Sequence, residues 1–367
     1  MSINAKPAVQ CQKLSPMSAL TVILWPANSA AARSWINCCQ QRRCQHFPRV
    51  LLEKPAAAGM SSAAARRMAK AAARNEHLSA GSGSEPRDMD RIIILCENTA
   101  IPARGILGEH GFAALIETSA GRYLFDAGQG NTLLHNAGIL GIDLARLNKI
   151  MLSHGHFDHT GGLAQVLGRT GPIDVHAHPD IFLKRFALIK ARRTNTLKPI
   201  HNPASAVKLK RLGARLVFNT AFTQIDRNLY LTGEVPRSSV FEKPDSRLVI
   251  KKAGKIVPDP LKDDQSAILK TRKGLVVIFG CAHAGIINTL QHIRQYLPDE
   301  KMYMILGGTH LGFSSDAQVA ASIDCLRNFA IEKIGVSHCT GGRAALALMN
   351  AFREKFFLAN AGSVIEI

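Results

Sequence analysis

The residues with the clearest chemical meaning lie in one short stretch, SHGHFDHTGG at 153–162. It holds four ligand-type side chains directly after an apolar, strand-like run: His154, His156, Asp158 and His159. Imidazole and carboxylate groups suit zinc, iron or manganese. A turn at a strand end can curl such side chains around one point, and the neighbouring glycines permit a tight backbone. We predict one metal ion on His154 and His156, and a second on Asp158 and His159.

Two later histidines each follow a predicted strand. His283 comes after LVVIFG, and His338 comes after IGV. Strand ends meet at one edge of an α/β sheet, where ligands gather. We therefore expect His283 to complete the ligands of the first ion and His338 those of the second. For each histidine, the alternative is a structural role as a hydrogen-bonding side chain.

These motifs together resemble the metallo-β-lactamase superfamily. HGHFDH matches its HxHxDH signature, and FDAGQG, GCAHAGI and SHCTGG occur in family order. Longer runs such as LGEHGFAALIET, GEVPR and GCAHAGIINT are similar to the subgroup of 7,8-dihydropterin-6-methyl-4-(β-D-ribofuranosyl)aminobenzene 5′-phosphate synthase and its bacterial relatives. The resemblance spans about residues 91–367. It implies a four-layer αββα sandwich of the α/β class with two divalent ions at one edge, zinc first, with iron or manganese as alternatives.

The resemblance also assigns supporting residues. Asp126 in FDAGQG corresponds to a buried carboxylate that orients metal ligands, as carboxylates behind a metal site commonly do. Many superfamily members have a bridging aspartate where this chain has Cys281. A thiolate there could bind or bridge a metal, but we favour a small buried residue behind the ligands. Asp264, in DDQ, is a further candidate near the site.

Catalytic and substrate-binding residues are less sharply defined. We predict that Asp158 and His310 act in catalysis, although His310 in GGTHL could instead cap a turn. The segment 184–215 holds ten Lys or Arg and no Asp or Glu, so it offers phosphate clamps or simply a solvated basic face. Arg237 in GEVPR is the sharper candidate for substrate binding, because it belongs to the resemblance.

The elements that must position these residues alternate along the chain, which indicates a layered α/β fold. We expect strands from Arg91 and at 112–117, 122–126, 147–152, 173–177, 275–279, 302–306 and 333–336. We expect helices at 131–141, from about 179, at 286–296 and from about 343.

The first 88 residues differ in composition from the rest. They hold twelve Lys or Arg against four Asp or Glu, and GSGSEP at 81–86 is typical of a flexible linker. We predict either a disordered extension, with a short basic helix at 60–76, or a start codon assigned too early. The catalytic domain is predicted at 89–367, with a cap or insertion at about 180–260.

Composition and net charge limit the binding partners and the cellular compartment that we expect. The net charge of +19 favours anionic partners, whereas 6% aromatic residues and no recognition motif do not favour nucleic acid. No run of eighteen apolar residues predicts a membrane span. Eight cysteines without paired CxxC spacing favour a reduced, cytoplasmic compartment. We expect a small anionic substrate and no membrane partner, and we leave a homo-oligomer open.

The predicted function is that of a metal-dependent hydrolase. Two divalent ions would activate water on an anionic, phosphorylated small molecule. One alternative is a synthase-type transferase that joins a pterin to a ribofuranosylaminobenzene phosphate. A second alternative is a nucleic-acid-processing nuclease, since superfamily nucleases share the HxHxDH signature. The same ligands serve these chemistries, so the ligands alone do not choose among them.

Overall fold

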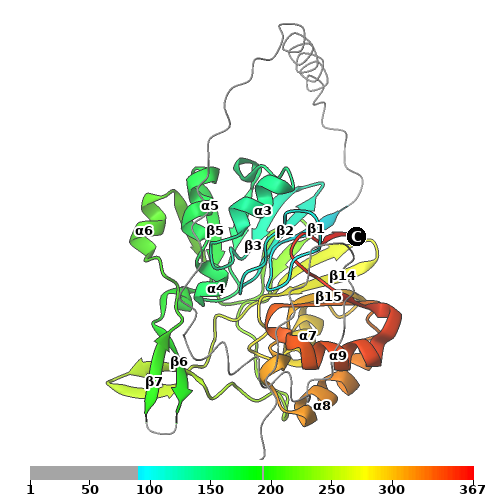
Figure 1. Cartoon of the computed structure of the whole chain (residues 1–367). Coiled ribbons are helices and arrows are strands. Elements are labelled where there is room, and N and C mark those ends of the chain that lie inside the picture. Colours follow the sequence, from blue (N-terminus) through cyan, green and yellow to red (C-terminus); the bar gives the residue numbers. More distant parts are fainter. Residues whose placement is uncertain (1–89, 192–193) are drawn as a thin grey trace, which may run out of the picture. The chain divides into compact units, whose positions relative to one another are not determined.

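The computed structural model describes residues 90–191 and 194–367. In this part of the chain, two seven-stranded sheets and one four-stranded sheet form, with helices outside the two larger sheets (Figure 1). The extension predicted at 1–88, with its basic helix, lies outside the described residues. Among the helices that the structure does describe, none is long and apolar enough to cross a membrane.

The first large sheet is antiparallel at one side and parallel at the other. Its strands are, in spatial order, β18 (Val364–Glu366), β1 (Arg91–Cys96), β2 (Ala113–Thr118), β3 (Gly121–Phe125), β4 (Lys149–Met151), β5 (Ile173–Ala177) and β8 (Ala214–Phe218). Strands β3, β4, β5 and β8 are parallel. Phe125 pairs with Met151, so Asp126 and Ser153 follow at the same edge of the sheet.

The second large sheet has the same mixed character. Its strands are, in spatial order, β17 (Phe356–Leu358), β16 (Lys333–Ser337), β15 (Met302–Gly308), β14 (Gly274–Phe279), β13 (Ala267–Thr271), β10 (Leu229–Leu231) and β9 (Thr223–Asp226). Strands β14 to β17 run parallel, and every residue of β14 and β15 is buried. Continuous apolar strands of this kind are typical of a sheet that is covered on both faces.

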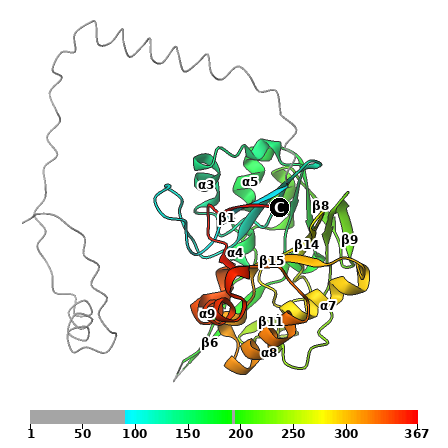
Figure 2. The same ribbon diagram turned by 90° about the vertical axis from the view of Figure 1, so that its right-hand side faces the viewer.

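The two sheets face each other and form the inner layers of a sandwich. Apolar side chains from both sheets make one core, which includes Phe125, Met151, Val276 and Met304. Helices α3 (Leu133–Ile139), α5 (Leu163–Thr170) and α6 (Ala206–Arg211) cover the first sheet, while α7 (Ile286–Tyr296), α8 (Asp316–Arg327) and α9 (Gly341–Phe352) cover the second (Figure 2). The predicted four-layer αββα sandwich is therefore confirmed.

A smaller sheet lies beside the sandwich, with the strand order β12 (Lys255–Pro258), β11 (Leu248–Lys252), β6 (Arg185–Lys190) and β7 (Asn195–Pro199). A small apolar cluster joins it to Phe157, in the one-turn helix α4 (Phe157–Thr160). Arg185, which is fully buried, pairs with Asp259 and Asp263 at 2.8 and 2.6 Å. Removing one partner of a buried ion pair costs about 3–5 kcal/mol, so this cluster fixes the small sheet to the sandwich.

Two predictions about this region need correction. The helix expected from about residue 179 is wrong: a short 3₁₀ turn, Pro179–Phe182, is followed directly by strand β6. The apolar residues of RFALIK pair with neighbouring strands instead of forming a helical face. The insertion is also narrower than the predicted 180–260, because β8, β9 and β10 belong to the two main sheets.

Candidate metal centre

The loop that follows β4 holds the HGHFDH motif in a tight turn, which ends in α4. A Cβ atom at Gly161 would collide with the backbone oxygen of Gln129, and one at Gly162 with that of Ala127. Only glycine allows this close approach of two backbones. The loop can therefore turn sharply enough to bring its four ligand-type side chains to one place.

Three ring nitrogens form a first ligand group. His154 Nε2 lies 2.9 Å from His156 Nδ1 and 3.2 Å from His283 Nε2. Ligands bound at about 2.0–2.1 Å to the corners of a tetrahedral zinc site are separated by roughly 3.3 Å. The observed spacing is that of ligands around one ion. The structure thus brings together the three residues predicted for the first metal.

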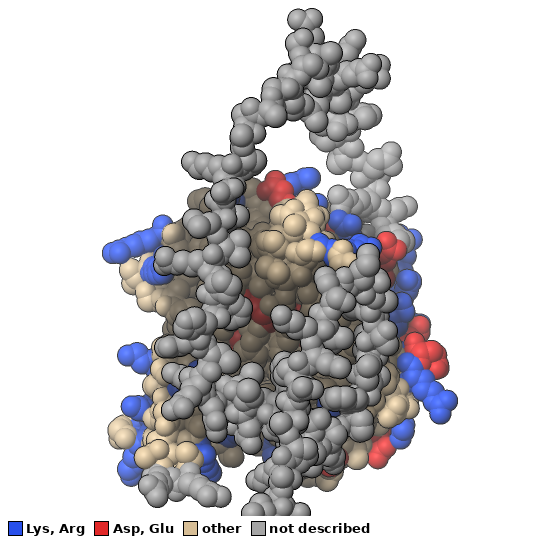
Figure 3. Space-filling view, viewed as in Figure 1, with Lys and Arg blue, Asp and Glu red and all other residues tan. Residues whose placement is uncertain are grey.

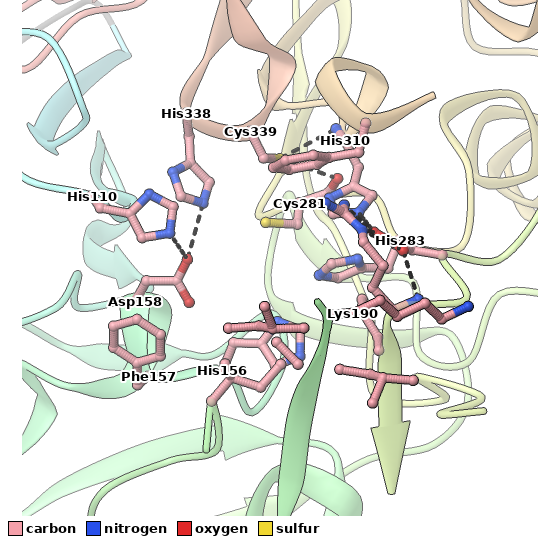
Figure 4. Close-up of a pocket in the computed structure, with 18 residues that line it drawn as sticks. His110, His156, Phe157, Asp158, Lys190, Cys281, His283, His310, His338 and Cys339 are labelled. Atoms are coloured by element: carbon pink, nitrogen blue, oxygen red, sulfur yellow. Dashed lines mark hydrogen bonds and ion pairs between the residues drawn. The ribbon is translucent and has the colours of Figure 1, made fainter. Parts of the chain in front are cut away.

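A second group is centred on Asp158. His338 Nε2 lies 3.3 Å from both His159 Nε2 and Asp158 Oδ2, and the last two atoms are 3.9 Å apart. These are the three residues predicted for the second metal. His110, which was not predicted as a site residue, also lies here, with its Nε2 3.0 Å from Asp158 Oδ2 (Figure 4). Its one sequence signal was its place in the LGEHGF motif.

The three histidines of the first group are in the neutral form that can bind a metal cation. Burial lowers the pKa of His154 and His283 well below the usual range, and that of His156 to about 3. Neutral imidazoles carry one donor and one acceptor nitrogen each, so three that face one another cannot all be satisfied among themselves. The nitrogens that face one another are His154 Nε2, His156 Nδ1 and His283 Nε2. A divalent ion between the rings fits this arrangement.

The second group differs in charge. Burial alone would lower the pKa of His159, but Asp126 and Asp158 outweigh burial and raise it to about 9. Burial alone would raise the pKa of Asp158, but His159, His110 and His338 hold it well below the usual range. A metal ion would take the place of the proton on His159, because ligands bind in their deprotonated form.

Cys281 lies between the two groups. Its Sγ is 3.1 Å from His159 Nε2. The same sulfur lies within 4.8 Å of the ligand atoms of His154 and His283, and within 4.8 Å of those of His159 and His338. The residue is buried, as expected, yet its thiol faces both ligand groups instead of standing behind them. Its position is that of a ligand that two ions could share.

Asp126 supports the loop after β4, which we call the loop half of the site because it carries His154, His156, Asp158 and His159. Its Oδ2 is 2.7 Å from His159 Nδ1 and accepts a hydrogen bond from Ser153 Oγ, which lies 2.9 Å from His154 Nδ1. Its Oδ1 accepts the Ser153 backbone N–H. One fully buried carboxylate thus orients a ligand of each group, which is the role that the sequence predicted for it.

His338 belongs to the strand-end half of the site, whose ligand-type residues follow β14, β15 and β16. It has supports of its own. Its backbone N–H donates to Glu97 Oε1 at 2.6 Å, and its Nδ1 lies 2.9 Å from Asn98 Oδ1. Both partners follow β1, at the opposite end of the chain from His338. Glu97 and Asn98 were not predicted as site residues, although they stand in the ENTA run that contributed to the resemblance.

His310 lies beside the first group, with its ring 4.3 Å from that of His283 between centroids. Its Nε2 is 3.2 Å from Asp245 Oδ2. Burial alone would lower its pKa, but Asp245 and Cys339 outweigh burial and raise the pKa to about 9. Asp245 also pairs with Arg247, whose guanidinium lies 4.3 Å from the centre of the Phe313 ring.

A cavity of about 500 Å³ opens onto both ligand groups. Ligand-type side chains form its floor, namely His110, His156, Asp158, Cys281, His283 and His338 (Figure 4). Its walls combine apolar side chains with cations, namely Phe157, Leu188, Ile189, Ile200, Leu248, Phe313, Lys190 and Arg247. Lys and Arg side chains also gather on the surface where Figure 1 places β6 and β7 (Figure 3).

Two further candidates, Arg237 and Asp264, contact the loop that carries His283. Arg237 donates to the backbone oxygens of His283 and Pro260, at 2.7 and 3.5 Å, and it does not line the cavity. Asp264 Oδ2 accepts the Ala284 N–H, and burial raises the pKa of Asp264 to about 6. Both residues therefore brace the loop that carries His283, while the cavity cations are Lys190 and Arg247.

An αββα sandwich with two adjacent ligand groups at one edge defines the metallo-β-lactamase fold. The family model described as "Metallo-beta-lactamase superfamily" matches residues 107–286. The synthase named in the sequence analysis, from Methanocaldococcus jannaschii, is 29% identical over 76% of this chain and 97% of its own length. An uncharacterized protein of the same organism is 32% identical over 75% of this chain and its whole length.

A solved structure agrees with these relatives. Tm1679, described as a metal-dependent hydrolase of the beta-lactamase superfamily, is 29% identical, with a TM-score of 0.65 over 76% of this chain and 99% of its own. The chain belongs to the metallo-beta-lactamase superfamily, in the subgroup that these relatives define.

Proposed function

We propose that this protein is a metal-dependent hydrolase that uses two divalent ions to act on a small, phosphorylated molecule. The observation that carries the proposal is the pair of ligand groups on the floor of one cavity, with neighbouring ligand atoms 2.9–3.2 Å apart in the first group and 3.3–3.9 Å apart in the second. Bound there, divalent ions supply a more acidic water molecule and stabilise negative charge that grows at the attacked atom. Zinc suits this mixed set of nitrogen, oxygen and sulfur ligands.

His310 is placed to move a proton. Its Nε2 is held by Asp245, and its Nδ1 is buried without a partner among the described residues. A ring fixed at one nitrogen presents the other in a defined direction, which a general acid or base requires. Asp158 contributes differently, as a ligand of the second group: its Oδ2 stands between His110 and His338 on the cavity floor.

The cavity walls favour an anionic substrate with an apolar part. Lys190 and Arg247 supply positive charge, and Phe157 and Phe313 supply flat apolar surfaces. Arg247 rests on Phe313 and is held by Asp245, so its guanidinium is preorganised for an oxygen-rich group. The name of the synthase relative contains a 5′-phosphate, which is consistent with this class of substrate.

The test is a turnover panel with purified protein refilled with zinc, manganese or iron. Phosphorylated esters and lactones are compared with their dephosphorylated analogues, and labelled solvent water shows whether its oxygen enters the product. We expect metal-dependent hydrolysis that prefers phosphorylated compounds. If no compound turns over although the metal is fully loaded, the protein is a metal-binding protein without this activity.

A second candidate is a synthase-type transferase, favoured by the match to the synthase over nearly its whole length. The same residues would then hold a pterin that carries a hydroxyl or phosphate leaving group beside a ribofuranosylaminobenzene phosphate. The amine nitrogen of the second molecule would form the new carbon–nitrogen bond as the carbon–oxygen bond to the leaving group breaks, and the amine proton would leave with that group or pass to solvent. Supplying the two substrates together distinguishes the candidates. A joined product without solvent oxygen supports the transferase, whereas two separate products containing solvent oxygen support the hydrolase.

A further inference from the structure

A third set of ligand-type side chains lies at the edge of the site already described. Cys281 Sγ, Cys339 Sγ and a ring nitrogen of His310 all lie within 4.8 Å of one another. Strands β14, β15 and β16 deliver them, one residue from each strand end, and these strands are parallel neighbours. The two sulfurs and the ring line the same cavity (Figure 4).

The geometry of His310 suits a ligand. Its Nε2 contacts the Asp245 carboxylate at 3.2 Å, which leaves Nδ1 buried and without a partner in the described chain. A carboxylate on one nitrogen of a metal-binding histidine fixes its tautomer and makes the other nitrogen a better donor. The backbone N–H of His310 also donates to Cys339 Sγ at 3.2 Å, so the two residues are held beside each other.

The donor set decides which ion would bind. Two thiols and one imidazole are soft to intermediate ligands, and such sets select zinc or Cu(I) over magnesium, calcium or manganese. Zinc–sulfur bonds of about 2.3 Å place two sulfurs roughly 3.8 Å apart at tetrahedral corners, so atoms already within 4.8 Å need only small side-chain shifts.

We propose that Cys281, His310 and Cys339 form a third, thiol-rich site for a soft divalent ion. It is separate in composition from the two histidine-rich groups but shares Cys281 with both of them. Binding releases the thiol protons and the proton on His310, since the ligands coordinate in deprotonated form.

Occupancy of this site would oppose turnover, and this second part rests on the proposed function. A third ion would hold Cys281 away from the two-ion centre and would occupy His310 Nδ1, the nitrogen we assign to proton transfer. Excess zinc or cadmium should therefore inhibit an enzyme that the first two equivalents activate.

The binding experiment uses the full-length chain in which Cys11, Cys38, Cys39 and Cys44 are replaced by Ser, so that the four thiols of the first 88 residues do not contribute. Protein loaded with two equivalents of zinc is titrated with cadmium, and sulfur-to-cadmium charge-transfer absorption and bound metal are both measured. We expect three equivalents of bound metal per chain in this background. The Cys339→Ser variant should bind two.

A matched control separates the site from general thiol binding. Cys325, on α8 and only partly buried, does not line the cavity. Cys325→Ser should still take up the third equivalent, whereas Asp245→Asn, which keeps both thiols, should bind it about 10- to 100-fold more weakly. Equal uptake and equal absorption by Cys339→Ser and Cys325→Ser would overturn the site.

The activity arm stands apart from the binding arm. In the Cys339→Ser variant, excess zinc should leave the activity at its own two-equivalent level, whereas the Cys325→Ser variant should be inhibited like the parent. Third-ion binding without inhibition upholds the site and overturns its effect on turnover. Absence of turnover in the parent contradicts the proposed function, while the metal count still tests the site.

Discussion

The two halves of the metal centre are built in different ways. The first half is one loop, in which His154, His156, Asp158 and His159 follow a single strand. The second half is assembled from three strand ends, which bring Cys281 with His283, then His310, then His338 with Cys339. Local backbone geometry creates the first half, whereas only the packing of a parallel sheet creates the second.

The groups that hold two of the ligand rings, those of His159 and His338, differ in charge as well. The buried carboxylate of Asp126 holds the loop half, and Asp263 accepts the Gly155 N–H. On the strand-end side, the ring of His338 is held by the neutral amide of Asn98. Hydrogen bonds to an ionised group are roughly twice as strong as neutral ones. The ring of His159 should therefore be held more firmly than the ring of His338.

The largest effect is expected from Asp158→Ala, which removes the carboxylate of the second group. Bound metal should fall from about two ions to about one, while the first group stays filled. Turnover should fall about 10²–10³-fold, the size seen when one group that stabilises transition-state charge is lost. Elemental analysis and rate measurements check this. Unchanged metal content in a folded variant would refute the assignment of Asp158 as a ligand.

A smaller effect separates the two kinds of support. Asp126→Asn keeps the shape and tolerates the left-handed backbone at this position, where φ is 62°. It should weaken metal affinity about 10- to 100-fold, the range for a carboxylate behind a metal ligand. Asn98→Ala, the matched change behind His338, should cost less. Competition with a chelator measures the metal affinity of both variants. A larger loss of affinity in Asn98→Ala than in Asp126→Asn would reverse the comparison.

The same contrast explains how far the sequence could lead. HGHFDH lies within six residues, so the loop half was predictable from the sequence, whereas the sandwich was implied by the family resemblance. His283 and His338 could be placed because each follows an apolar strand. By contrast, Asp245 and Arg247 lie just before strand β11 of the small sheet. No periodic pattern in the sequence marked that segment. Arg237 was chosen for its motif, but its guanidinium reaches backbone oxygens, a contact that only the fold decides.

The two arginines give the next test. Arg247→Ala should lower the specificity constant for phosphorylated compounds about 10- to 100-fold, because hydrogen bonds to charged groups contribute about 1.5–3 kcal/mol. The loss should be much smaller on a dephosphorylated analogue, with metal content unchanged. Arg237→Ala, which removes a contact to the His283 loop, should affect both compounds alike. Equal losses for Arg247→Ala on both compounds would remove the phosphate-binding role.

The smallest effect is expected from deleting residues 1–88. Every residue of both halves of the site lies between Asp126 and Cys339, or in His110 and the 97–98 pair. The relatives are matched over 97–100% of their own length by about three quarters of this chain. The free energy of unfolding should change by less than about 0.5 kcal/mol, the usual range for changes away from the core. Metal content and turnover should also stay the same. Chemical denaturation of the full-length and shortened proteins, side by side, provides the measurement. A shortened protein that loses metal from one ligand group only would show that the first 88 residues support that half of the site, and the comparison of the two halves would then have to include them.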